Sequence, residues 1–225
     1  LTKGVPNSLE MTGGNVVITG SNMSGKSTFL RTLSTGAVLA QTFYTVPADS
    51  YTASFFNILT SISPSDNLIE GKSYYMAEAE ALLRMVQTLD ENRTSLLMID
   101  EIFRGTNPIE RVAAASSLLS YLARHNTMVI VATHDIEITQ KVADQYTSYH
   151  FSENVTKDAL DFDYKLKPGV LKVPNGIRIL EYLGYPQEIT DEAYRATGYV
   201  GLTAAEEKQN QDQDKNTIQG EDQDE

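Results

Sequence analysis

The 225-residue sequence has no cysteine and no long apolar run, and each absence narrows the possible functions. Without cysteine, neither disulfide bonds nor thiolate metal sites are available. No run approaches the roughly eighteen apolar residues of a membrane-spanning helix, and no signal-like N-terminus is present. We therefore expect a cytoplasmic protein without a membrane partner. The chain opens on Leu1 instead of Met, which suggests a fragment of a longer protein.

Basic residues are also scarce, and the formal net charge is −12. Residues 204–225 contribute −6 of this charge, and Ile218 is their only large apolar residue. Such a segment buries too little surface to offset its ordering entropy, so residues 201–225 are predicted to form a disordered acidic tail. The rest of the chain is acidic too. Since DNA affinity depends on Lys and Arg neutralising phosphates, we expect any DNA-contacting parts to lie outside this chain.

The segment Gly20–Ser27 fits the phosphate-loop pattern G-x-x-x-x-G-K-[ST]. Asn15–Thr19 before it is typical of a buried strand, and Ser27–Leu33 after it is typical of a helix. In this pattern backbone N–H groups surround an anion, Lys26 reaches the β- and γ-phosphates, and the Ser27 hydroxyl ligates Mg²⁺. A chance Gly/Ser turn is the alternative, but it would give this pattern in about one chain in a hundred of this length. The pattern predicts nucleotide binding.

An apolar run, Ser95–Ile99, ends in two acids, Asp100 and Glu101. Such a run is typical of a buried parallel strand that delivers carboxylates at its C-terminal end. Asp100 would hold Mg²⁺ and Glu101 would polarise the attacking water. Neighbouring residues of a strand point to opposite faces, so both reach one site only if the strand ends there. Taken alone, such a run is more often a strand that enters a surface turn; together with the phosphate loop, it favours the metal site.

Another predicted strand, Thr127–Thr133, ends in a polar cluster. His134 could contact the γ-phosphate or the attacking water there. Alternatively, Thr133 or Asp135 caps the next helix and His134 is an incidental exposed residue.

The elements alternate as in an α/β protein, with an expected mixed central sheet flanked by helices. We predict a strand over Tyr51–Thr60, a helix over 73–90, and a hairpin that pairs Tyr149–Phe151 with Phe162–Leu166. Asn107–Glu110 has the N-cap, proline and acid of a helix start, which makes Glu110 structural.

Two short predicted helices, 177–183 and 187–196, are joined through Gly184 and resemble a helix-turn-helix. The second helix is too acidic to read DNA, so we interpret the pair as a subunit-contact element. The predicted division is an ATPase domain over 1–170, this helical element over 171–200 and the tail. Arg104 could sense charge at the site or be a solvated turn residue.

Four segments together resemble the MutS family of DNA mismatch repair ATPases. The loop contains Asn22-Met23, which is characteristic of that family. The others resemble its metal-binding strand, its switch segment and the segment that a partner subunit presents to the nucleotide; these are Asp100–Thr106, Ala132–His134 and Gly71–Glu78. The matches span roughly residues 5 to 195 in the family's order.

The resemblance implies the C-terminal domain of such a protein, with an ABC-type P-loop fold that works as a face-to-face homodimer with ATP and Mg²⁺. Glu101 and His134 would be catalytic, Ser27 and Asp100 would hold the metal, and Ser73 would reach the partner's nucleotide in trans, although by itself Ser73 could simply be a helix N-cap. The implied nucleotide-binding residues of the loop are Gly20, Ser21, Asn22, Met23, Ser24, Gly25, Lys26, Ser27 and Thr28.

The sequence also departs from the family pattern, as expected of a divergent member. Ser21 and Ser24 replace the common proline and glycine, Asp135 stands where an aromatic residue is more usual, and Lys3–Asn7 lacks the aromatic residue that often stacks on adenine. Two functions therefore stay open. One is an ATPase that drives a DNA-bound clamp in mismatch repair or a related DNA transaction. The other is a nucleotide-gated dimerisation module with slow or vestigial hydrolysis.

Overall fold

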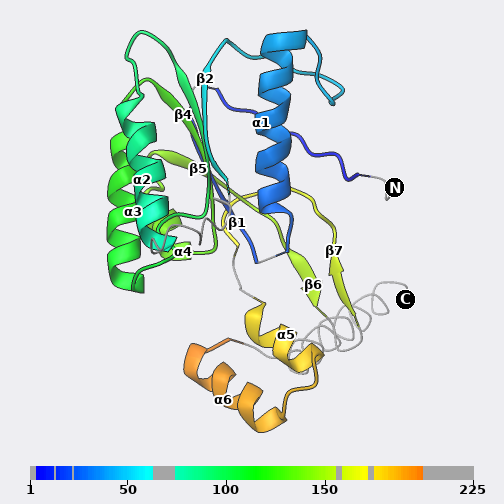
Figure 1. The fold of residues 1–225 in the computed structure, drawn as a ribbon. Helices are drawn as coiled ribbons and strands as arrows, with labels where there is room; N and C mark the ends of the chain where they lie inside the picture. Colours follow the sequence, from blue (N-terminus) through cyan, green and yellow to red (C-terminus); the bar gives the residue numbers. More distant parts are fainter. Residues whose placement is uncertain are drawn as a thin grey trace, which may run out of the picture. The chain divides into compact units, whose positions relative to one another are not determined.

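The computed structural model describes residues 4–12, 14–21, 23–62, 74–155, 159–171 and 175–199. Its contacts divide the chain into two compact units. The first comprises Leu1–Ser152 and Tyr164–Leu171, and the second comprises Glu153–Asp163 and Lys172–Glu225. Figure 1 shows the elements of both. The predicted acidic tail, 201–225, lies outside the described residues.

A six-stranded mixed sheet forms the centre of the first unit, in the order β2-β3-β4-β1-β5-β8. Neighbours among the first five strands are parallel, and β8 runs antiparallel to β5. The mixed sheet is therefore confirmed. The strands are β1 (Asn15–Thr19), β2 (Asn57–Ile62), β3 (Ser95–Asp100), β4 (Thr127–Thr133), β5 (Tyr146–His150) and β8 (Lys167–Pro168).

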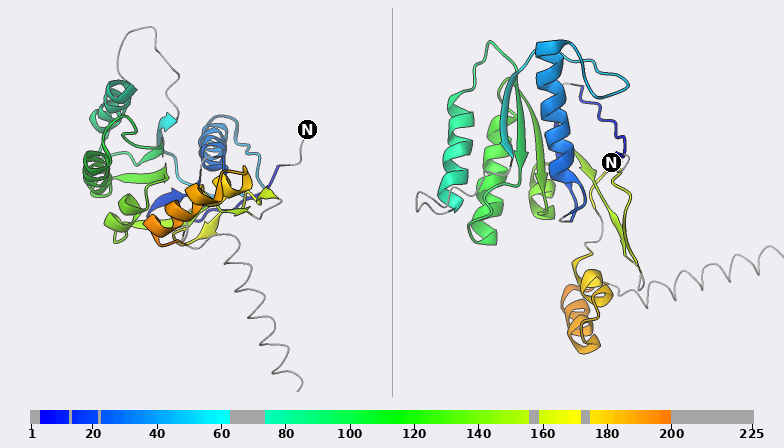
Figure 2. Two further views of the ribbon diagram at one scale, coloured as in Figure 1. Left: turned by 90° about the horizontal axis from the view of Figure 1, so that it is seen from below. Right: turned by 45° about the vertical axis from the view of Figure 1, so that its right-hand side comes forward.

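Helices cover both faces of this sheet, as Figures 1 and 2 show. On one face lies α1 (Lys26–Phe43), and on the other lie α2 (Tyr74–Gln87), α3 (Pro108–Leu122) and α4 (Ile136–Lys141). Side chains alternate along each strand, so Val16 and Ile18 pack in the core with α1 while Val17 packs in the core with the other helices. Burial on both faces explains why these strands are continuous apolar runs in the sequence.

The second unit contains a hairpin and two helices. β6 (Glu153–Val155) pairs antiparallel with β7 (Leu160–Phe162), and α5 (Gly176–Tyr182) packs against α6 (Gln187–Thr197). Gly184 lies between the helices with φ 79°, a left-handed conformation that glycine adopts without strain. Both predicted helices are confirmed.

One predicted strand has the wrong start, and one predicted strand pairing is wrong. The strand predicted over Tyr51–Thr60 begins only at Asn57, because the Gln41 side chain bonds both backbone groups of Phe56, at 2.7 and 3.1 Å. Tyr149 and His150 belong to β5, which pairs with β1 and β8, and not to the predicted hairpin. Alternation of apolar and polar residues marks a strand but does not specify its partner.

Within the described ranges, no helix combines the length and apolarity needed to cross a membrane.

Candidate nucleotide-binding and catalytic site

The Gly20–Ser27 loop connects β1 to α1, and its backbone bends where the glycines lie. Gly20 has φ 151° and Gly25 has φ 105°. A Cβ atom on Gly20 would lie 2.9 Å from the Phe151 carbonyl oxygen, so only glycine fits there. Met23 is also left-handed, with φ 71°, and its side chain is exposed. The loop therefore holds a backbone conformation that most sequences could not adopt.

Lys26 folds back over this loop. Its Nζ donates to the carbonyl oxygens of Gly20 and Ser21, at 2.7 Å each, and the residue is buried. The first turn of α1, which begins at Lys26, has no side-chain cap and no acidic residue. Its amide groups and its positive dipole end therefore suit an anion.

The remaining loop residues that the structure describes differ in exposure. Ser24 is buried, and its hydroxyl has no hydrogen-bond partner among the described residues. Ser21 and Ser27 are half-buried, whereas Thr28 is exposed at the start of α1. Asn22, which was predicted to bind nucleotide, lies outside the described residues. So does Ser73, predicted to act in trans, with Gly71 and Lys72 before it.

Asp100, the last residue of β3, fits a metal ligand. The residue is 9% exposed, and in the described part of the chain its Oδ1 has no hydrogen-bond partner. A buried carboxylate oxygen without a donor is unfavourable unless a cation reaches it. The described residues include no group of three or more His, Cys, Asp or Glu side chains that could hold a metal by themselves. A single carboxylate such as Asp100 fits Mg²⁺, which commonly takes one carboxylate together with hydroxyl, phosphate and water oxygens.

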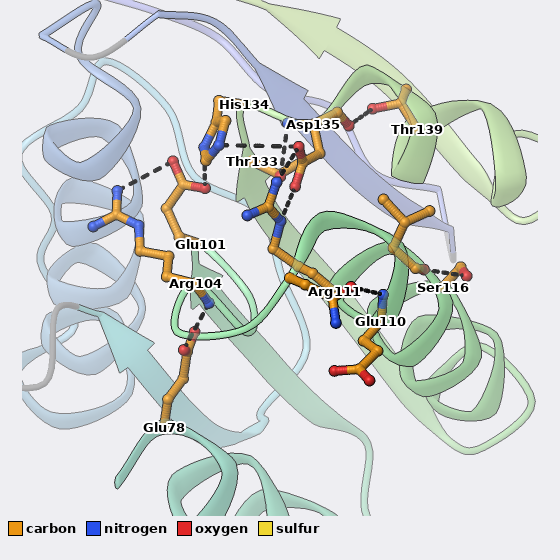
Figure 3. Close-up of polar contacts among 12 residues, drawn as sticks. Glu78, Glu101, Arg104, Glu110, Arg111, Ser116, Thr133, His134, Asp135 and Thr139 are labelled. Carbon is orange, nitrogen blue, oxygen red and sulfur yellow. Dashed lines mark hydrogen bonds and ion pairs between the residues drawn. The ribbon is translucent and has the colours of Figure 1, made fainter. Parts of the chain in front are cut away.

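Glu101 and His134 meet where β3 and β4 end side by side. Figure 3 shows the contact, in which His134 Nδ1 lies 2.8 Å from Glu101 Oε2. The backbone turns out of the strand at Glu101, where φ is 63°. The Glu101 amide donates to the Ala132 carbonyl oxygen at 2.9 Å, which fixes the two strand ends together. Asp100 and Glu101 thus lie beside one edge of the sheet because the strand ends between them, as the sequence predicts.

The charges around Glu101 favour its ionised form. Burial alone raises the pKa of this carboxyl, but the hydrogen bond from His134 and the charges of His134, Arg104 and Lys26 outweigh burial and bring the pKa below its ordinary value. The same hydrogen bond raises the pKa of His134. Arg104 places Nη2 3.4 Å from Glu101 Oε1, so this half-exposed arginine faces the site and is not merely a solvated turn residue.

Asp135 contacts an arginine that the sequence analysis did not single out. Arg111, near the start of α3, donates to both Asp135 carboxylate oxygens at 2.7 and 3.0 Å. Asp135 occupies the N-cap position of α4, yet its side chain makes no capping hydrogen bond; its own amide donates to the Thr133 hydroxyl at 3.1 Å. Asp135, the residue after His134, is therefore held by Arg111 of α3. The alternative that His134 is incidental does not fit its bond to buried Glu101.

Glu110 has the structural role that the sequence predicts. Its amide donates to the Asn107 side chain at 3.0 Å, which caps α3. Its carboxylate accepts from the Thr106 hydroxyl at 2.9 Å.

With this geometry established, comparisons with known proteins identify the family. A family described as MutS domain V matches residues 16–200. The chain is 35% identical over 190 residues to the DNA mismatch repair protein MutS of Thermus thermophilus, covering 84% of this chain and 23% of that protein. It is 34% identical over 197 residues to the MutS protein of Natronomonas pharaonis, covering 86% and 23%. It is 31% identical over 202 residues to the DNA mismatch repair protein MSH3 of Candida glabrata, covering 84% and 20%.

This chain belongs to the MutS family. It spans about a quarter of the length of the MutS relatives that it matches. Three of the four segments of the MutS resemblance, those at the ends of β1, β3 and β4, lie at one edge of the sheet.

An aromatic residue lies beside the loop in this MutS chain, although Lys3–Asn7 contains none. A Cβ atom on Gly25 would come 3.3 Å from the Tyr164 ring, which is 43% exposed. Asn7 holds Tyr164 in place: its Nδ2 donates to the Tyr164 carbonyl oxygen at 2.8 Å, and its Oδ1 accepts from the Leu166 amide at 2.7 Å. Nothing local in the sequence marks this contact, because it joins segments more than 130 residues apart.

Proposed function

We propose that this chain is the Mg²⁺-dependent ATP-binding and ATP-hydrolysing domain of a MutS-like DNA-binding protein. The observation that carries the proposal is the Glu101–His134 contact at the ends of neighbouring strands, within the electrostatic reach of Lys26. A buried carboxylate, an imidazole and the loop lysine near the carboxyl ends of neighbouring parallel strands suit hydrolysis of a bound triphosphate.

Binding in this proposal rests on the Gly20–Ser27 loop. Its amide groups and Lys26 would surround the phosphates, while Ser27 and Asp100 would hold Mg²⁺. The bound ion would neutralise charge that develops on the phosphate oxygens. Tyr164 offers an apolar ring beside the loop where the nucleotide base could lie.

Hydrolysis would depend on Glu101. Its lowered pKa keeps the carboxylate ionised at neutral pH, so it can accept a proton from an attacking water. His134, whose pKa is raised, would orient that carboxylate through Nδ1 and add positive charge near the γ-phosphate. A glutamine at position 101 would keep the shape but could not accept the proton.

For the parent protein, we propose ATP-driven switching of a homodimeric clamp on DNA, in mismatch repair as in the named relatives or in a related DNA transaction. In this proposal the two composite sites receive Ser73 from the opposite subunit, and α5 and α6 contact the partner. The net charge of −12 agrees with DNA being held by other parts of the parent.

The second candidate is a nucleotide-gated dimerisation module with slow or vestigial hydrolysis. The loop residues and the residues proposed for hydrolysis come from separate segments of the chain. Nucleotide binding could therefore persist in a protein that does not hydrolyse ATP. The intact Glu101–His134 pair favours the ATPase.

The test compares the wild type with Glu101→Gln for ATP affinity, ATP-dependent dimerisation and turnover. We expect unchanged affinity, stronger dimerisation and a turnover reduced by more than about tenfold. Glu110→Gln is the matched control, because it changes an exposed acid at a helix start nearby and should leave turnover within about twofold. Equal turnover in wild type and Glu101→Gln would contradict the role of Glu101. Tight ATP binding without wild-type turnover would favour the module.

A further inference from the structure

The turn that follows Glu101 has a strained backbone. Glu101 and Phe103 have φ values of 63° and 57°, in the left-handed region that non-glycine residues rarely adopt. A residue in this conformation is strained and persists only where the surroundings hold it. Some other part of the chain must therefore hold the turn.

Glu78 of α2 makes the contact that does so. Its Oε2 accepts from the Arg104 amide at 2.9 Å, and the residue is 3% exposed. Figure 3 shows its carboxylate directed at the Arg104 nitrogen, with Glu101 on the far side of the turn. The Phe103 amide also lies close enough to lower the pKa of the Glu78 carboxyl. Burial raises the pKa of Glu78, and these two amides act in the opposite direction.

A second contact joins the same two segments. A Cβ atom on Gly105 would lie 2.6 Å from the Tyr75 Cβ, so the turn fits closely against the first residues of α2. The Tyr75 and Phe103 rings also meet, with centroids 5.9 Å apart. The turn after Glu101 and the start of α2 therefore interlock at two points.

We propose that Glu78 is a positioning residue for hydrolysis, which acts through the Arg104 amide to set the orientation of the Glu101 carboxylate. The inference rests on the proposed function, since it assigns Glu78 a part in the same reaction. A carboxylate suits the position because it has enough acceptor sites for two neighbouring amides of a left-handed turn. Through Glu78, a shift of α2 would change the geometry of the water-activating group.

The experiment uses the full chain with Glu78→Ala and Glu78→Gln, and Gln87→Ala as a surface control on the same helix. We expect Glu78→Ala to lower kcat for ATP about tenfold, because small displacements of a catalytic group are costly. The KM and the nucleotide affinity should stay within about twofold, since the Gly20–Ser27 loop is untouched. Glu78→Gln, whose amide oxygen can still accept a hydrogen bond, should stay within about threefold of wild type.

A double-mutant comparison separates positioning from a general loss of structure. In the Glu101→Gln background, followed by single-turnover hydrolysis of labelled ATP, Glu78→Ala should add no further loss, because its effect passes through the Glu101 carboxylate. An undiminished tenfold loss there would overturn the inference. If Glu78→Ala does not fold, Glu78→Asp takes its place: it keeps the charge but is one methylene too short, and should be slower than Glu78→Gln. Equal rates for those two variants would also overturn it.

The two proposals fail differently. If the wild type hydrolyses ATP and Glu101→Gln does not, but Glu78→Ala turns over like the wild type, only the inference about Glu78 is wrong. If the wild type binds ATP without hydrolysing it, the proposed ATPase function fails and the inference fails with it.

Discussion

The Gly20–Ser27 loop and the Glu101–His134 pair lie at the same edge of the sheet, but the chain builds them in different ways. The loop is contiguous, and Lys26 bonds carbonyl groups five and six residues back. Glu101 and His134 are 33 residues apart and meet only because β3 and β4 are parallel neighbours. The turn that carries Glu101 depends on Glu78, 26 residues before its contact at Arg104.

This difference implies that the proposed nucleotide binding and the proposed hydrolysis would respond differently to mutation. The loop depends on backbone conformation and one lysine, so distant substitutions should leave it intact. The orientation of Glu101 depends on packing between β3, β4 and α2, and many positions can disturb it. A family member could therefore lose hydrolysis and keep binding.

The largest effect is expected for Lys26→Ala. Removing the ammonium group takes away the positive charge proposed to meet the β- and γ-phosphates, so ATP affinity should fall at least about a hundredfold, beyond the measurable range in calorimetry. Lys141→Ala, which removes an exposed lysine from α4, is the matched control and should bind ATP normally. Unchanged affinity in Lys26→Ala would show that the loop does not bind the phosphates.

His134→Ala should affect hydrolysis and leave binding alone. Loss of the imidazole removes a hydrogen bond and a charge from Glu101, and turnover should fall on the order of a hundredfold. Nucleotide affinity, measured by fluorescence titration, should change by less than about threefold. The control is His125→Ala, since that ring bonds the Tyr121 carbonyl oxygen at the end of α3, away from the site. If His134→Ala and His125→Ala had equal turnover, His134 would have no catalytic part.

Sequence patterns predicted the contiguous features best. The strands at Asn15–Thr19 and Ser95–Asp100 are as expected, because burial on both faces leaves an unbroken apolar run. The end of a strand between Asp100 and Glu101 was also predictable, since two adjacent acids can serve one site only there. The burial of Glu78 was also predictable from its spacing. It precedes Leu82 and Met85, which are buried, by four and seven residues, so it belongs to the buried face of α2.

Contacts between distant segments had no such signal. Arg111 and Asp135, or Asn7 and Tyr164, are ordinary polar pairs until the fold brings them together. The same holds for Gln41, whose side chain bonds Phe56 and delays the start of β2 to Asn57. Local strand propensity cannot predict that a side chain will bond the backbone in place of a neighbouring strand.

Two glycines allow a further comparison, between Gly105 in the turn after Glu101 and Gly36 within α1. Gly105→Ala would place a Cβ against Tyr75, and such overpacking costs about 1–3 kcal/mol. For a chain of this size we expect the Tm to fall by roughly 2–4 °C per kcal/mol. Turnover should fall as the turn moves. Gly36→Ala in α1 meets no atom within 4 Å and should raise the free energy of unfolding by about 0.5–1 kcal/mol. If both substitutions stabilised the protein equally, the turn would not be tightly packed on α2.

The smallest effect is a pH dependence of stability at Glu78. Burial raises its folded pKa above the ordinary 4.5, so its stabilising contribution is fully present below pH 4.5 and is lost as the pH rises through the folded pKa. The Glu78→Gln side chain cannot ionise, so it does not lose stability as the pH rises. Thermal unfolding of both proteins at about pH 4, 6 and 8 should therefore show the Tm of Glu78→Gln rising relative to wild type as the pH increases. Other titrating groups are shared and cancel in this difference. A Tm difference that stays constant with pH would mean that folding does not raise the pKa of Glu78, so that the bonds from the backbone amides fully offset the effect of burial.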